Sequence, residues 1–262
     1  MKTGFFAQPH PPYRRANYGF AYQWLEEVGR LAALLAQVEA LRAADPDHRY
    51  LATLDDVQQC SYTSGHASMD DRLYLDSPAG MDWDDPAQEA AWNLQALQHR
   101  ALQLRQAQNP SSWAAVCGSL STSPDDIAAL VAANRSQDAL LDDVVYIQRL
   151  PLASDDPLIA GQPNGYFSAD WDSFQNHAIH QHLAQQHGYQ LFAMGASWMA
   201  LARAEPPNAA QAQALVRDLR LLYATGDEEL LAHPGWQALP VLLQSQRSLV
   251  LGYTEDMADR WE

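Results

Sequence analysis

Apolar residues recur at helical spacing in two long segments of the N-terminal half. In the first, from about residue 17 to residue 44, the intervals between successive apolar positions are 4, 3, 4 and 3, at Trp24, Val28, Leu31, Leu35 and Val38. The second begins where Asp85 caps Pro86 and repeats this spacing as far as residue 104. Seams of matching length predict a pair of long helices packed side by side, antiparallel because one long connection separates them.

The connection between these segments, about residues 45–84, is not a plain loop. Residues 50–57 fit a short helix, whereas residues 61–68 are small and polar and fit an irregular segment. Long irregular segments inside a compact domain are often functional. We therefore expect this connection to form a recognition surface.

The pattern changes after residue 110. Ser123 and Pro124, followed by two acidic residues, predict a helix that reaches about residue 134, because serine caps a helix and proline suits its first position. Residues 143–150 are β-branched and aromatic and predict the first strand. The segments predicted after it are a helix over 173–187, a hairpin of 189–194 and 198–203, helices over 209–223 and from 227, and a strand over 248–253.

In this prediction helices dominate the first 135 residues and strands follow. We expect an α+β protein: a helix-rich N-terminal region with a long helix pair, then a small, mostly antiparallel sheet flanked by helices. Residues 1–135 form the helical region and residues 136–262 the α/β region, either as separate units or as one continuous domain. A parallel doubly wound sheet is the alternative, less favoured because few strands are predicted.

Acidic residues outnumber basic ones by 32 to 16, for a formal charge of -16. Such a charge repels phosphate backbones and accelerates encounter with basic proteins. Arg14 and Arg15 form the only basic doublet, so we expect no nucleic-acid partner. Several acids, including Asp85, Asp125 and Asp126, lie at predicted helix starts and have a structural reason to be there.

The remaining composition predicts a reduced, cytoplasmic protein without membrane contact. Cys60 and Cys117 are far apart and belong to no CxxC or Cys/His motif, so we expect two buried thiols and not a disulfide or a zinc ribbon. No apolar run fits a signal peptide or the roughly 18 to 20 residues needed to span a bilayer.

Four of the nine histidines lie between residues 177 and 187. On a helix, Phe174, Ala178, Ile179 and Leu183 would form the buried face. His177, His180 and His187 would then face solvent and His182 the core, so the interpretation is surface histidines with one packed in the core. A metal site here would use Asp170, Asp172, His177 and His180, although HExxH is absent.

Signatures of other chemistry are missing from the sequence. The segment from Gly195 to Met199 lacks the second glycine of GxSxG, and neither a P-loop nor GxGxxG occurs. The acidic doublets place their side chains in different directions, so they do not make catalytic dyads. We expect no cofactor, and the balance favours a protein that is not an enzyme.

Two functional hypotheses follow. The first is an acidic protein–protein interaction module, for instance an immunity-type neutraliser of a basic toxin or enzyme. Its candidate contact residues are Asp82, Trp83, Asp84, Asp85, Asp155, Asp156, Glu255, Asp256 and Asp259. The alternative is a metal-assisted hydrolase built on Asp170, Asp172, His177 and His180. An oligomeric scaffold that uses the two helical seams is a weaker third hypothesis.

Overall fold

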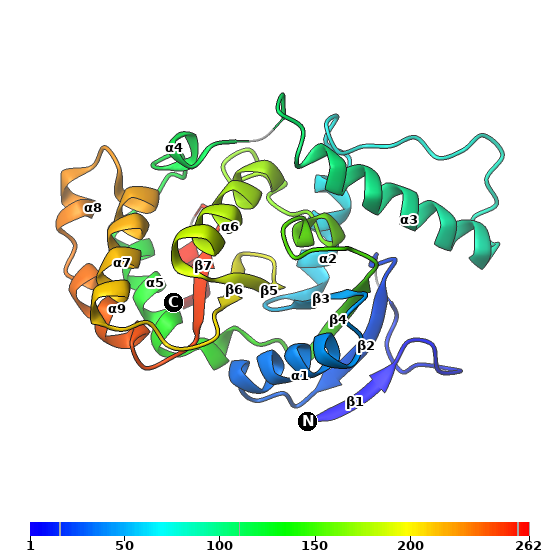
Figure 1. The fold of residues 1–262 in the computed structure, drawn as a ribbon, viewed down its shortest axis with the longest axis horizontal. Coiled ribbons are helices and arrows are strands. Elements are labelled where there is room, and N and C mark those ends of the chain that lie inside the picture. The colour runs from blue at the N-terminus through cyan, green and yellow to red at the C-terminus, as the bar shows by residue number, and fades with distance from the viewer. Residues whose placement is uncertain (16, 110, 256, 262) are drawn as a thin grey trace.

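Seven strands form one mixed sheet across the middle of the molecule (Figure 1). The computed structural model describes residues 1–15, 17–109, 111–255 and 257–261. In spatial order the strands are β1 (Lys2–Phe5), β2 (Ala21–Glu26), β4 (Val144–Leu150), β3 (Arg49–Thr53), β5 (Gln190–Met194), β6 (Trp198–Ala202) and β7 (Ser248–Gly252). With helices packed around this sheet, the α+β class predicted from the sequence is confirmed.

One parallel pair lies at the centre of the sheet. Ala52 of β3 is opposite Ala193 of β5, and Thr53 is opposite Met194. The other neighbouring strands pair antiparallel. The sheet is therefore two antiparallel halves joined at β3 and β5, and the carboxyl ends of these two strands lie at the same edge.

Helices enclose the sheet. In Figure 1, α1 (Leu31–Ala44) lies below β3 and α6 (Ser173–His187) lies above β5 and β6. Every residue of β6 and β7 is buried, as expected for strands covered on both faces. The other helices are α2 (Val57–Ala67), α3 (Pro86–Gln103), α4 (Trp113–Val116), α5 (Pro124–Arg135), α7 (Ala209–Ala224), α8 (Glu228–Ala232) and α9 (Gly235–Leu243), with 3-10 turns η1 (Gln137–Leu140), η2 (Leu158–Gly161) and η3 (Met257–Trp261).

These helices divide into two groups at opposite ends of the molecule. α5, α7, α8 and α9 gather beside β7, and α3 lies at the other end, at the upper right of the view (Figure 1). Within the described ranges, no helix combines the length and the apolar character needed to cross a bilayer.

Capping patterns located several helices correctly. Asp85 caps α3 with Pro86 in its first turn, and Ser123 with Asp126 forms a capping box on α5. α6 spans the predicted residues, and its predicted buried positions Phe174, Ala178, Ile179 and Leu183 are buried. The 143–150 strand, the 189–203 hairpin and the final strand are also confirmed, as β4, β5 with β6, and β7.

The single helix predicted over residues 17–44 is wrong. The chain forms β2, turns at Glu27 and Gly29, which both have positive φ, and only then enters α1. The burial of β2 alternates, with Gln23 and Leu25 buried and their neighbours partly exposed. Aromatic residues at every second position from Tyr18 to Trp24 carried this strand signal, and the helical interval from Trp24 to Val28 obscured it.

The 45–84 connection also differs from the prediction. Residues 49–53 form the central strand β3, which shows no alternation because its inner residues are buried on both faces. Residues 57–67 form α2, in which Ser61, Thr63 and Ser64 are buried, because small side chains let the helix pack closely. Only residues 68–85 remain irregular for most of their length.

The predicted side-by-side pairing of two long helices is wrong. α1 packs mainly against β3, whereas α3 packs against η2 at the other end of the structure (Figure 1). Strands also occur well before residue 136, since β1, β2 and β3 join the same sheet as β4 to β7. The two predicted regions thus share one sheet.

A buried carboxylate holds the carboxyl ends of the two central strands together. Asp55, directly after β3, is 3% exposed and accepts hydrogen bonds from the backbone N–H of Ser197 (3.0 Å) and Trp198 (3.3 Å). Its own carbonyl accepts from Ala196 N–H at 3.0 Å. Gly195 is needed in this turn because a Cβ there would collide with the Asp55 carboxylate. Asp55 therefore fixes β3 to the β5–β6 hairpin.

We predict that Asp55→Ala lowers the free energy of unfolding by about 3 kcal/mol, because two N–H groups in the turn lose their side-chain acceptor. Urea unfolding of the purified protein measures the difference. Asp143→Ala is the matched control: Asp143 is exposed, and its loss should change stability by less than about 0.5 kcal/mol. Equal effects of the two substitutions would contradict the role given to Asp55.

Candidate functional site

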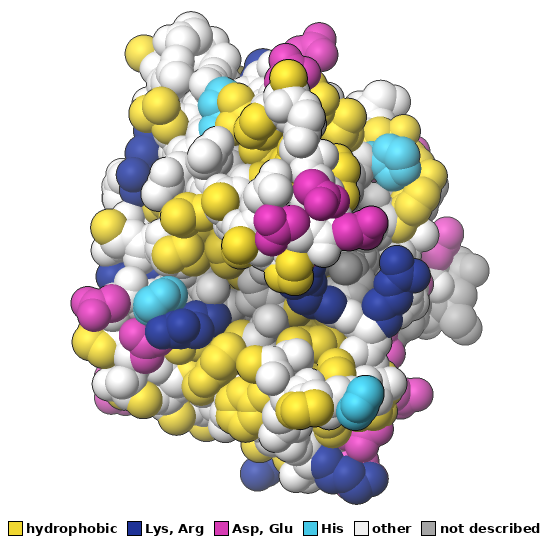
Figure 2. All heavy atoms as spheres, turned by 90° about the vertical axis from the view of Figure 1, so that its right-hand side faces the viewer, with side chains coloured by type: hydrophobic (Ala, Val, Ile, Leu, Met, Phe, Trp, Pro, Cys, Tyr) yellow, Lys and Arg dark blue, Asp and Glu magenta, His cyan; other side chains and the backbone are white. Residues whose placement is uncertain are grey.

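Exposed aromatic and apolar side chains are concentrated on one surface. We call this surface, formed by Tyr62, His66, Met69, Tyr74, Trp83, Tyr166 and Phe167, the aromatic face. Its large hydrophobic members are between 42% and 58% exposed. The part of this surface near α3 and residues 68–85 faces the viewer in Figure 2, where hydrophobic side chains gather around a hollow and both acidic and basic side chains lie beside them. Such clustering is unusual on a surface that contacts only water.

The hollow at one end of the aromatic face has a volume of about 350 Å³. Its walls come from residues 17–20, from α2 and α3, and from the irregular segment 68–85. Met69, Tyr74 and Trp83 are at once exposed and part of its lining. The hollow is therefore open and offers apolar and aromatic surface to an entering group.

Arg100 of α3 is a cationic group in this hollow. Its Nε donates to the carbonyl of Ala160 at 2.9 Å, and no ion pair links it to an acidic side chain among the described residues. Burial lowers the pKa of Arg100 to about 10. A half-buried guanidinium without a counter-charge has two further nitrogens with which to bind a carboxylate or phosphate.

The other end of the aromatic face is a row of rings. The Tyr62 and His66 rings are 4.4 Å apart between centroids, His66 and Tyr166 are 4.7 Å apart, and Tyr166 and Phe167 are 5.2 Å apart. Met69 lies between the row and the hollow, because it lines the hollow and also contributes to a depression beside His66 and Tyr166. The aromatic face is therefore continuous from Trp83 to Phe167.

Acidic residues border the row of rings. Phe167 shares a depression with Asp170, Glu255 and Asp259. Burial, together with the charge of Glu255, raises the pKa of Asp170 to about 6, even though its carboxylate accepts a hydrogen bond from Phe167 N–H at 3.3 Å. Asp170 would be stabilised in its charged form by a cation from outside the chain.

Most of the predicted contact residues lie around the aromatic face. Asp82, Trp83 and Asp84 are exposed at the hollow end, and Asp85 caps α3 beside them. Glu255 and Asp259 are exposed at the ring end, while Asp256 lies outside the described residues. The structure thus brings two distant acidic segments to opposite ends of one surface.

Asp155 and Asp156 are engaged in ion pairs within the chain. Asp155 lies 3.2 Å from Arg42 and 3.7 Å from Arg49, and Asp156 lies 2.7 Å from Arg105. Hydrogen bonds, first of all from His177 and then from Gln181 and Arg105, hold the pKa of Asp156 well below its usual range. This doublet serves the structure, and the aromatic face does not include it.

The four side chains predicted for a metal site are not gathered. Asp172 caps α6 and pairs with Arg72 at 2.7 Å, and Asp170 lies beside Phe167. His177 bonds Asp156, and His180 lies 3.1 Å from the Met199 sulfur. Burial lowers the pKa of His180 to about 3, so its imidazole is neutral.

The predicted orientation is wrong for His177, His180 and His182. His177 and His180 are 1% and 7% exposed, and the partly exposed ones are His182 and His187. The reason is that α6 is covered on more than one side, by the sheet and by the segment that carries Asp156, so an outward position on an isolated helix becomes an inner one.

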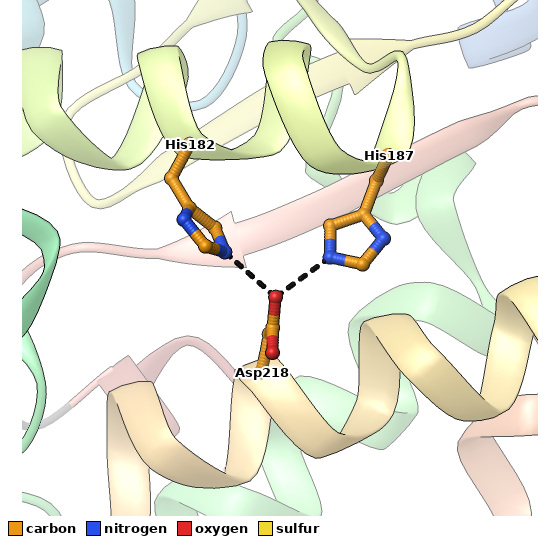
Figure 3. A group of neighbouring side chains, drawn as sticks. All are labelled: His182, His187 and Asp218. Carbon is orange, nitrogen blue, oxygen red and sulfur yellow. Dashed lines mark hydrogen bonds and ion pairs between the residues drawn. The ribbon is translucent and has the colours of Figure 1, made fainter.

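His182 and His187 meet Asp218 of α7 (Figure 3). Their Nε2 atoms lie 2.6 Å and 2.8 Å from the same carboxylate oxygen, Oδ2. The Trp113 ring stacks on His182 at 3.7 Å with an angle of 4° between the ring planes. In the described part of the chain this trio is the one cluster of His, Cys, Asp and Glu with the proximity that a metal ion requires.

Neither cysteine is prepared for nucleophilic chemistry. Burial raises the pKa of Cys60 to about 12, and burial together with the charge of Asp218 raises that of Cys117 to about 11. Thiols with such pKa values stay protonated at neutral pH, whereas nucleophilic cysteines have lowered values. Both are free thiols, but only Cys60 is fully buried as expected.

Comparison of this chain with protein-family models, with curated proteins and with solved structures finds no match.

The sequence placed Tyr62 and His66 in a connection expected to form a recognition surface but did not single them out, and it missed Tyr166 and Asp218 as site residues. Tyr62 and His66 are four residues apart, the spacing of one helix face, but the small polar residues around them concealed the helix. Tyr166 and Asp218 carried no local signal, because each reaches its partners only through the packing of separate segments.

We predict that Asp170→Asn stabilises the protein at pH 8 and loses this advantage at pH 4. A carboxyl group whose pKa rises from 3.8 to about 6 on folding stabilises the fold below pH 3.8, and that contribution is lost as the pH rises through 6. Asparagine keeps an oxygen for the Phe167 N–H and cannot ionise. Urea unfolding of both proteins from pH 4 to pH 8 measures the difference.

The control for this experiment is Ser168→Ala, which alters an exposed neighbour without removing a titrating group. A stability difference between Asp170→Asn and the parent protein that stays constant from pH 4 to pH 8 would contradict the prediction.

Proposed function

We propose that this chain is a protein-binding module that holds a basic protein partner on the aromatic face. The observation that carries the proposal is the continuity of this surface, on which half-exposed rings and Met69 run from Trp83 to Phe167. Tyrosine and tryptophan are enriched among the residues that dominate binding energies. The face combines such anchors with a polar, acidic border, which is the usual anatomy of a protein interface.

Charge supports a basic partner. The chain has 16 more acidic than basic residues. Asp82 and Asp84 are exposed at one end of the aromatic face, and Glu255 and Asp259 at the other. Opposite charges on a partner would raise its association rate, while the aromatic anchors would supply most of the affinity. An immunity-type neutraliser of a basic toxin or enzyme is a protein of this kind.

The hollow restricts which chemical groups of the partner can enter it. Its rim is aromatic, so it favours an apolar side chain, and Arg100 favours a carboxylate. A basic protein that inserts an apolar side chain next to an Asp, a Glu or its own terminal carboxylate satisfies both conditions. The buried apolar group and the paired charge would be the centre of the interface.

We predict that Trp83→Ala weakens partner binding by roughly 30-fold, the effect of losing an aromatic anchor of about 2 kcal/mol. Phe167→Ala should weaken it in the same direction from the other end of the face. A partner recovered from an extract of the native cells on the immobilised protein would be purified, and its affinity for each variant measured by calorimetry.

Leu221→Ala provides the control, since Leu221 is also half-exposed and lies outside the aromatic face, on α7. The proposal requires that the recovered protein be basic and that its association slow as salt is added. Equal binding by the parent protein, Trp83→Ala and Phe167→Ala, or recovery of acidic proteins alone, would refute it.

A further inference from the structure

His182, His187 and Asp218 form a convergent set of ligand atoms on two facing helices. Both imidazoles extend from α6 toward α7, and the Asp218 carboxylate rises between them (Figure 3). The three ligand atoms all lie within 4.8 Å of one another. Metal ions need such convergence, and it does not arise from the helical spacing of α6 alone, because the third group comes from a different helix.

The hydrogen bonds of this cluster converge on one atom of Asp218. Two Nε2 atoms contact the single oxygen Oδ2, so both rings must carry their proton on Nε2. Each Nε2 would instead present a lone pair to a metal in the tautomer that carries the ring proton on Nδ1. The same arrangement that places two donors on one acceptor therefore also places two nitrogens and one oxygen around a common point.

Ring orientation and access both favour an ion at that point. Trp113 stacks flat on the His182 ring and holds its plane. The His182 and Asp218 side chains are 18% and 24% exposed, so an ion can enter and water can complete its coordination. His187 is more enclosed, with 8% of its side chain exposed.

We propose that His182, His187 and Asp218 bind a zinc ion, with water in the remaining coordination position. Two imidazoles and one carboxylate suit zinc, which accepts nitrogen and oxygen ligands in a tetrahedral arrangement. The ion would take the place of the two Nε2 protons, each ring then carrying its proton on Nδ1, and would link α6 to α7. This site is independent of the aromatic face and of the function proposed for it.

The experiment uses the full-length protein after treatment with a chelator. Zinc sulfate is titrated into it in a calorimeter, and the melting temperature is recorded with and without zinc. The expected result is one zinc ion per chain, with a higher melting temperature because the ion binds only the folded state.

Two variants separate metal binding from hydrogen bonding. Asp218→Asn keeps an oxygen that accepts from both imidazoles but lacks the charge, and His187→Gln removes one nitrogen ligand. Each should bind zinc at least roughly tenfold more weakly than the parent protein. His48→Gln is the control, since His48 bonds a single carboxylate, that of Asp45, at 3.0 Å and belongs to no such cluster among the described residues.

Circular dichroism of each metal-free variant establishes that it is folded. Zinc binding by the parent protein and by His48→Gln, together with weak binding by the two cluster variants, supports the site. The proposal is overturned if the parent protein takes up no stoichiometric zinc, or if a folded Asp218→Asn binds zinc as tightly as the parent.

Discussion

The buried carboxylate of Asp55 is the interaction on which the rest of the structure depends. β3 and β5 are parallel and belong to opposite halves of the sheet, so no short hairpin joins them. Asp55 links the end of β3 to the β5–β6 turn through the N–H groups of Ser197 and Trp198. A polar side chain at 3% exposure is tolerated because these donors replace the water that it loses.

The same junction positions the aromatic face. α2 begins two residues after Asp55, and Cys60 on its inner side accepts a hydrogen bond from Gln162, which also donates to the Met194 carbonyl at 2.6 Å. Asn164 donates to the Gly195 carbonyl at 3.2 Å. These buried bonds dock the segment before Tyr166 against α2 and the end of β5, and so bring the Tyr166 ring to His66. The exposed rings are therefore attached to a buried, hydrogen-bonded interior.

The acidic residues divide into two groups with different physical roles. Asp85, Asp126 and Asp172 satisfy N–H groups at helix starts, and Asp155 and Asp156 form ion pairs with arginines. Asp82, Asp84, Glu255 and Asp259 are exposed around the aromatic face. The net charge of -16 consequently overstates the acid that is free to meet a partner; four exposed acids border the aromatic face, and others, such as Glu39, Glu205 and Glu228, are exposed elsewhere.

The sequence by itself determined the elements whose signals are local. Asp85 with Pro86 and Ser123 with Pro124 mark helix starts because capping involves residues two or three apart, and the β-branched run before Pro151 marks β4. Only the tertiary structure decided which strands are buried on both faces and which side chains from separate segments lie together. β3 has no alternation of apolar and polar residues because both of its faces are covered. The predicted helix from Trp24 to Val38 does not form as one element because the chain turns at Glu27 and Gly29. His182, His187 and Asp218, like Trp83 and Phe167, share a surface only because separate segments pack together, and no spacing along the chain encodes that packing.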